Sequence, residues 1–160
     1  MNDMVTTRTI EAPVSAVWHA WNTSDEVKQW WGPTGFTCPV AEMDVRVGGS
    51  SLVCMRAPQE YGGGDIYNTW TYTVVEPETK LEYLAHFTDE KRTKLDPAAM
   101  GMPAGIPAEV PHSVTFVDKD GKTEVTVVEK GYATPEAAEM SKQGMDQCLD
   151  KLEAALKAAV

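Results

Sequence analysis

Short stretches in which hydrophobic and polar residues alternate occupy most of the chain and predict an antiparallel sheet. Such alternation is typical of strands that bury one face, and many of the residues involved are β-branched or aromatic. The stretches with this β-forming pattern are residues 5–10, 36–46, 50–57, 66–75, 81–87, 112–117 and 123–129. Turn-forming residues separate several of them, so we expect about six or seven strands connected in sequence.

A helical period replaces the alternation after the first stretch. Apolar side chains recur three and four residues apart, at Val14, Val17, Trp18 and Trp21. Pro13 suits the first turn of this helix because proline has no amide hydrogen to lose there. Thr23 and Glu26 form a Thr-x-x-Glu capping box, which predicts a second short helix that continues through Trp31 and ends at Gly32-Pro33.

The last segment of the chain predicts a long amphipathic helix. Thr134-Pro135-Glu136 supplies an N-cap, a first-turn proline and an acid that the helix dipole favours. The apolar stripe of this helix is Met145, Leu149, Leu152 and Leu156. The order of elements gives an α+β fold in which a curved sheet wraps around the terminal helix. Because a sheet curved around a cylinder rarely fills its own concavity, we expect a cavity between sheet and helix.

The segment 88–110 follows neither period. It contains Pro97, Pro103 and Pro107 together with two glycines and two methionines, and connections of this length are uncommon inside a compact domain. Two interpretations are open, a lid or binding loop and a solvated excursion without a role. We treat the segment as a lid or insertion within one domain that covers residues 1–160.

Composition and charge exclude several classes of protein. The 160 residues are 42% hydrophobic and carry a net charge of −10, which fits a globular protein and disfavours binding to nucleic acid or anionic membranes. No apolar run is long enough to span a bilayer, and the N-terminus lacks the features of a signal peptide. We therefore expect a cytoplasmic protein, either a monomer or a homodimer, with reduced cysteines.

The sequence carries no catalytic or metal-binding signature. His19, His86 and His112 show no metal-ligand spacing, Cys-x-x-Cys and Gly-x-Ser-x-Gly are missing, and the carboxylates are scattered. We expect no metal, no cofactor and no catalytic residue that the sequence alone can name.

A series of short motifs runs in order along almost the whole chain. They are Ala12-Pro13-Val14, Trp30-Trp31-Gly32-Pro33, Asp44-x-Arg46-x-Gly48-Gly49, Val75-Glu76-Pro77, Val114-Thr115-Phe116, Gly131-Tyr132 and the closing helix from Gly144 to Leu156. This series resembles the START-like, or helix-grip, superfamily, and within it the bacterial relatives of the C-terminal domain of the heat-shock protein 90 ATPase activator. The resemblance implies the helix-grip fold. It implies no chemistry, because the motif residues are of the kind that packs helices and forms turns.

The candidate ligand-binding residues are mostly apolar and aromatic side chains expected on the concave side of the sheet and on the final helix. They are Met55, Trp70, Tyr72, Tyr83, His86, Met102, Phe116, Met140, Gly144 and Cys148. Two interpretations are open here as well, a lined cavity and a filled core. The methionines favour an adaptable pocket, since thioethers reshape around varied ligands.

The strand over residues 81–87 leaves one orientation open. His86 and Tyr83 lie on opposite faces of this strand, so only one of them faces the cavity. The family resemblance favours Leu81, Tyr83 and Phe87 inside, whereas a bulge near the strand end would turn His86 inward.

Three functions are compatible with these observations. The one we favour is a non-enzymatic protein that binds a small hydrophobic or aromatic molecule in the cavity. The second, implied by the resemblance, is a module that contacts a chaperone through its acidic surface. The third, also suggested by the resemblance because some helix-grip proteins are such enzymes, is an enzyme of the aromatase/cyclase kind, in which His86, Tyr83 or Tyr72 would transfer a proton.

Overall fold

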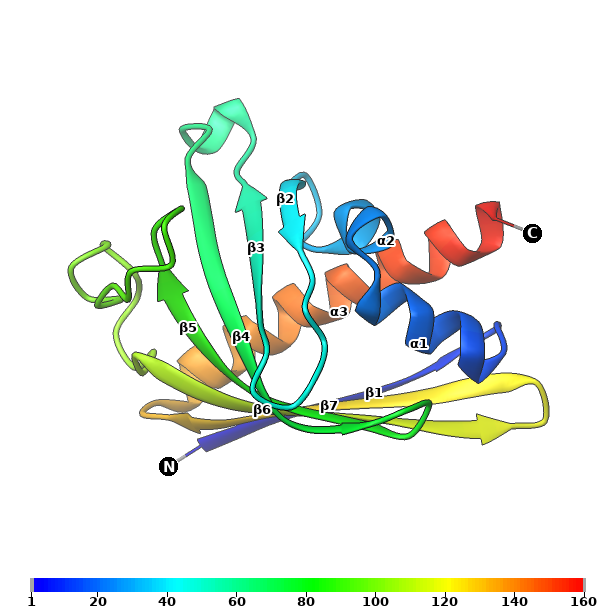
Figure 1. Ribbon diagram of the computed structural model, residues 1–160. Coiled ribbons are helices and arrows are strands. Elements are labelled where there is room, and N and C mark those ends of the chain that lie inside the picture. The colour runs from blue at the N-terminus through cyan, green and yellow to red at the C-terminus, as the bar shows by residue number, and fades with distance from the viewer. Residues whose placement is uncertain (1, 160) are drawn as a thin grey trace.

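Seven antiparallel strands form one strongly curved sheet in the computed structural model, which describes residues 2–159 (Figure 1). The strands are β1 (Asn2–Ile10), β2 (Thr37–Glu42), β3 (Ser50–Arg56), β4 (Asp65–Glu76), β5 (Lys80–Thr88), β6 (Glu109–Lys119) and β7 (Lys122–Tyr132). Their order across the sheet is β1-β7-β6-β5-β4-β3-β2. Strands β2 to β7 therefore form a meander, and β1 pairs with β7 at the opposite edge from β2.

The helices cover the concave side of this sheet. The short helices α1 (Val14–Asn22) and α2 (Ser24–Trp30) connect the two edge strands, a one-turn 3₁₀ helix (Gln59–Tyr61) follows β3, and α3 (Pro135–Ala158) runs along the hollow of the sheet (Figure 1). This is the α+β helix-grip architecture that the sequence predicts. No helix within residues 2–159 has the length and apolar character needed to cross a membrane.

The caps of the helices agree only partly with those predicted from the sequence. Thr134 caps α3 as expected, since its side chain accepts a hydrogen bond from the amide of Ala137. Pro13 lies at the N-cap of α1, one residue before the first turn. The capping box predicted for α2 does not form, because Thr23 makes no side-chain cap bond and the Glu26 carboxylate contacts Nδ1 of His19 instead.

The β2 region is shorter than the pattern predicts. The strand ends at Glu42, and the chain then leaves the sheet because side chains take up its next amides. Met43 donates its N–H to Oγ of Ser24 at 3.1 Å, and Asp44 donates its N–H to Oγ of Ser51 at 3.0 Å. These bonds replace sheet pairing and tie the connection to α2 and β3.

A cluster of aromatic side chains fills the concavity where α1 and α2 cover the sheet. Trp21 and Trp30 are both fully buried, and their rings lie 4.5 Å apart. The indole N–H of Trp30 donates to the carbonyl of Ala20 at 3.0 Å, which joins the two short helices. Trp21 also packs edge-on against Phe116 of β6, at 6.3 Å. Each buried indole contributes about 2–3 kcal/mol to stability, so this cluster fixes both helices on the sheet.

Candidate ligand-binding site

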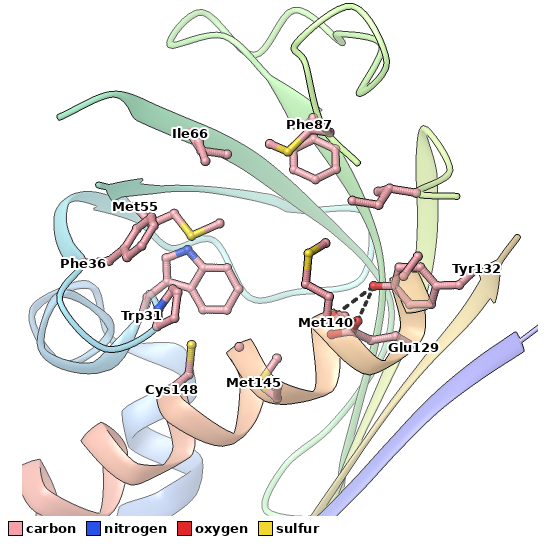
Figure 2. Close-up of a pocket in the computed structure, with 16 residues that line it drawn as sticks. Trp31, Phe36, Met55, Ile66, Phe87, Glu129, Tyr132, Met140, Met145 and Cys148 are labelled. Atoms are coloured by element: carbon pink, nitrogen blue, oxygen red, sulfur yellow. Dashed lines mark hydrogen bonds between the residues drawn. The ribbon is translucent and has the colours of Figure 1, made fainter. Parts of the chain in front are cut away.

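A cavity of about 300 Å³ lies between the concave face of the sheet and α3 (Figure 2). Its lining consists of Trp31, Pro33 and Phe36 after α2, Met55, Ile66 and Phe87 from the sheet, Met102 and Ile106 from the segment before β6, Glu129 and Tyr132 at the end of β7, and Ala137, Met140, Ser141, Gly144, Met145 and Cys148 on α3. This volume is at the lower end of the range for small-molecule sites. The lining is mostly apolar, and four of its members are methionines.

Helix α3 leaves room for the cavity at Gly144, which has no side chain. Met140, Gly144 and Cys148 follow one another at four-residue steps and all line the hollow, as the sequence predicts. A Cβ atom built on Gly144 meets no neighbouring atom within 4 Å. Met140 is 43% exposed, which places it at the mouth.

The loop that follows α2 is tied to α3 across one side of the cavity. Nζ of Lys151 donates to the carbonyl oxygens of Gly32 and Phe36, at 2.9 and 3.0 Å. The amide of Thr34 donates to Oε1 of Gln147 at 3.0 Å. Hydrogen bonds from a charged donor typically contribute about 1.5–3 kcal/mol, so these contacts hold the loop that carries Trp31 and Phe36 in place.

The segment between β5 and β6 forms another part of the wall. Met102 and Ile106 reach the cavity, whereas many of the neighbouring residues are exposed. Gly105 anchors the segment to the start of α3, since its carbonyl accepts the amide of Ala133 at 2.9 Å. A Cβ atom at Gly105 would lie 2.6 Å from Oγ1 of Thr134, and φ is +96° at this residue. Both features require glycine here.

One patch of the lining is polar, and it surrounds Glu129. One carboxylate oxygen accepts hydrogen bonds from the hydroxyls of Tyr132 and Ser141, as the dashed lines in Figure 2 show. The other oxygen lies 3.0 Å from Nε2 of His112, whose Nδ1 lies 2.9 Å from the carbonyl oxygen of Val110. A carbonyl and a carboxylate only accept, so both ring nitrogens of His112 donate and the imidazole is protonated. Glu129 and His112 therefore form a buried ion pair.

Each member of this ion pair stabilises the charged form of the other. Burial by itself disfavours both charged forms, but the attraction and the hydrogen bond between the partners outweigh it. The pKa of His112 is therefore raised and the pKa of Glu129 is lowered, the latter also by hydrogen bonds from Ser141 and Tyr132.

The indole nitrogen of Trp31 is a second polar atom at the cavity. It is buried and has no hydrogen-bond partner. Figure 2 shows the indole of Trp31 between Met55 and Cys148, with the polar patch of Glu129 and Tyr132 beyond it along α3. An unpartnered buried donor is costly in a folded protein, so this N–H is available to an acceptor that enters the cavity.

The structure brings half of the predicted site residues to the cavity. Met55, Met102, Met140, Gly144 and Cys148 line it, and Trp70 lines a smaller hollow beside it, together with Glu129 and His112. The prediction that Tyr72, Tyr83 and Phe116 line this cavity is wrong, because these three side chains pack inside the core.

The core contacts of these aromatic residues are specific. Oη of Tyr72 is hydrogen-bonded to Oγ of Ser51 at 2.8 Å, Tyr83 stacks between Trp70 and His112, and Phe116 packs against Trp18 and Trp21.

The structure also shows which face of β5 points toward the cavity. The strand keeps its alternation, with Leu81 and Tyr83 buried inside and Phe87 at the cavity. His86 faces the other side, where its Nε2 lies 2.9 Å from Oε1 of Glu109 on β6. The alternative in which a bulge turns His86 inward is therefore wrong. His86, Tyr83 and Tyr72 do not reach the cavity, and burial raises the pKa of both tyrosines, so they are not placed to transfer protons to a ligand there.

Several lining residues are not among the candidates predicted from the sequence, and the most important is Glu129, which His112 of the neighbouring hollow contacts from behind. His112 continues the inward alternation of Val114 and Phe116, and Glu129 continues that of Val125 and Val127. The short turn between the two strands sets them in register, and His112 pairs directly with Glu129. This register was the signal that could have predicted a buried ion pair.

A long helix gripped by a curved antiparallel sheet, with an apolar hollow between them, defines a helix-grip protein. The chain belongs to the family described as Activator of Hsp90 ATPase homolog 1-like protein, whose model matches residues 11–157. This confirms the resemblance inferred from the motifs. Within residues 2–159, no group of three or more His, Cys, Asp or Glu side chains is arranged to hold a metal ion.

Solved structures share this fold over nearly their whole length. A Staphylococcus epidermidis protein is 27% identical, with a TM-score of 0.77, and the match covers 99% of this chain and 92% of that one. A Chromobacterium violaceum protein is 24% identical, with a TM-score of 0.77 and 96% of each chain covered. The AHSA1 protein of Silicibacter pomeroyi is 17% identical, with a TM-score of 0.78, and covers 99% of this chain and 100% of that one. No curated protein matches the sequence.

Proposed function

We propose that this protein binds a small hydrophobic or aromatic molecule in the cavity between the sheet and α3. The observation that carries this proposal is a mostly apolar hollow of about 300 Å³ beside a densely packed aromatic core. A core that served stability alone would be more stable with this space filled, because every contact missing from its walls forfeits dispersion and hydrophobic energy.

The chemistry of the lining supports binding rather than covalent catalysis. Burial raises the pKa of the Cys148 thiol to about 12, so the thiol stays protonated and packs as a small apolar group. The thioethers of Met55, Met102, Met140 and Met145 adapt to ligand shape, and a sulfur atom beside an aromatic ring contributes about 0.3–1.5 kcal/mol.

A thermal-shift screen against lipids and aromatic metabolites tests the proposal, with Gly144→Leu as the blocked variant. The leucine side chain would enter the hollow from α3, so ligands that stabilise the wild type should not stabilise this variant. Gly144→Ala is the matched control and should keep most of the response. A ligand present at 100 times its Kd should stabilise the wild type by about 2.7 kcal/mol. A flat response across the whole panel would overturn the proposal.

A second candidate function is contact with a chaperone. It is favoured by the description of the family as activator-like and by the net charge of −10, which suits a basic partner surface. Titration into the host's own heat-shock protein 90 with an ATPase readout tests it. An unchanged rate at high excess of this protein would count against it, and a salt-sensitive increase would support it.

A further inference from the structure

We infer that the ligand of this cavity is a neutral aromatic or alicyclic alcohol, whose hydroxyl group donates a hydrogen bond to the polar wall formed by Glu129, Tyr132 and Ser141. The inference rests on the proposed function and specifies the class of ligand. The hydrogen bonds of the wall, the balance of charge beside it and the size of the hollow support it.

The polar wall has spare acceptors but no spare donor. One oxygen of the Glu129 carboxylate accepts the hydroxyls of Tyr132 and Ser141, and the other pairs with His112. A carboxylate has about four lone-pair sites, so one remains open, and both hydroxyl oxygens keep lone pairs. The two hydroxyl hydrogens are used inside the wall, including in the alternative in which Tyr132 donates to Ser141 at 3.0 Å. A ligand group at this wall must therefore supply the hydrogen.

The charge of the wall excludes ionised head groups. Glu129 is the one charged side chain in the lining, and His112 already balances it from behind. A carboxylate ligand would place a second negative charge beside Glu129 in mostly apolar surroundings. An ammonium group would lose its hydration shell to share a carboxylate that is already paired. A neutral hydroxyl incurs neither of these energetic costs and donates its hydrogen to one of the open acceptors.

The rest of the lining fixes the body of the molecule. The residues around the hollow are mostly methionine, aromatic and small aliphatic side chains, which favour a flat apolar ring system. A volume of 300 Å³ equals about ten water molecules of liquid, which suits a molecule of one or two rings. The unpartnered indole N–H of Trp31, away from the polar wall, adds a donor for an acceptor or a π face at the far end of the ligand.

Calorimetric titration with three probes of nearly equal shape tests this inference on the intact protein. The probes are 2-naphthol, which donates a hydrogen bond, 2-methoxynaphthalene, which keeps the oxygen but not the hydrogen, and naphthalene-2-carboxylate, which is anionic at pH 7. We expect 2-naphthol to bind about tenfold more tightly than the methyl ether, because the ether leaves the acceptors of the wall unsatisfied. The carboxylate should bind most weakly.

Two variants assign the preference to the polar wall. The double variant Glu129→Leu/His112→Phe removes the carboxylate together with its counterion and frees the hydroxyl hydrogens of Tyr132 and Ser141, which an ether oxygen can then accept. It should reduce the preference for 2-naphthol over its ether to about threefold or less. Gln143→Ala, at an exposed position of α3 outside the lining, is the control and should leave the affinities and the preference unchanged.

The outcomes separate this inference from the function on which it rests. Equal affinity for naphthol and ether, tightest binding of the carboxylate, or an unchanged preference in Glu129→Leu/His112→Phe would overturn the inference alone. Binding confined to panel members without a neutral hydroxyl would do the same. If none of the three probes binds and the wider panel is also flat, the proposed function itself is wrong.

Discussion

The two halves of the concavity differ in how they are filled. Where α1 and α2 cover the sheet, rigid indoles interlock, with Trp21 and Trp30 at 0% exposure. Farther along α3, toward its N-terminus, the cover is a pair of loops and a helix face that carries Gly144, and the side chains that meet there are largely flexible thioethers. The same sheet and the same helix run through both halves. The comparison shows that side-chain shape, rather than backbone architecture, decides which half is packed for stability and which is left open.

The largest expected effect is the loss of an indole from the filled half. Trp21→Ala should lower the free energy of unfolding by about 5 kcal/mol, because the residue is fully buried and the neighbouring rings cannot close the space. Met102→Ala in the open half should cost about 1 kcal/mol or less, since this side chain already borders a hollow. Urea denaturation measures both values. Similar losses at the two positions would remove the distinction between the halves.

The next effect concerns the ion pair at the boundary of the open half. Glu129→Leu should cost about 3 kcal/mol, because it leaves the charge of His112 buried without a partner. The double variant Glu129→Leu/His112→Phe should recover most of this loss, since phenylalanine keeps the ring that stacks on Tyr83 at 4.9 Å. Denaturant titration of the single and double variants checks the coupling, and purely additive losses would contradict it.

The same pair should shape the dependence of stability on pH. The pKa of Glu129 is lowered, so its contribution is complete above the ordinary value of 4.5 and declines as the pH falls below it. The pKa of His112 is raised, so its contribution is complete below 6.5 and declines as the pH rises through the shifted value. The difference in stability between wild type and double variant should therefore favour the wild type most between about pH 4.5 and 6.5. A difference that does not change with pH would contradict the pairing.

A smaller effect is expected where the loop before β6 joins α3. Gly105→Ala should lower stability by about 1–3 kcal/mol, because it adds strain at positive φ and a Cβ atom too close to Thr134. Gly101→Ala is the matched control, as its φ is +77° but no atom lies within 4 Å of the added Cβ. Thermal melts and limited proteolysis within residues 88–110 measure the difference. Equal effects of the two substitutions would show that the close approach of Gly105 to Thr134 does not constrain the loop.

Much of the fold follows from local patterns, and the failures have physical causes. Alternation predicts β4, β6 and β7, and Thr134 with Pro135 predicts the start of α3, because these signals act between near neighbours. The capping box at Thr23 fails because a tertiary partner, His19, takes the Glu26 side chain.

The candidate site shows the same limit. Four-residue spacing predicts Met140, Gly144 and Cys148 along the cavity, because one helix face carries all three. Tyr72 and Phe116 also face inward, but the depth at which they pack depends on α1 and on Ser51, which the pattern of one strand does not contain. Glu129 was missed because a charged residue on a strand usually faces water. Its burial depends on the register of β6 with β7 and on Ser141 from α3.

The free energies of unfolding of two Gly144 variants test most directly whether the open half contains space that a side chain or ligand can occupy. Gly144→Ala should raise the free energy of unfolding by about 1 kcal/mol through helix propensity alone. Gly144→Leu should raise it further, because a Cβ atom at this position meets no neighbour within 4 Å and the rest of the side chain would bury apolar surface in the hollow. If the leucine variant is instead less stable than the alanine variant by about 1–3 kcal/mol, as overpacking of a closed core would produce, the hollow does not exist in solution.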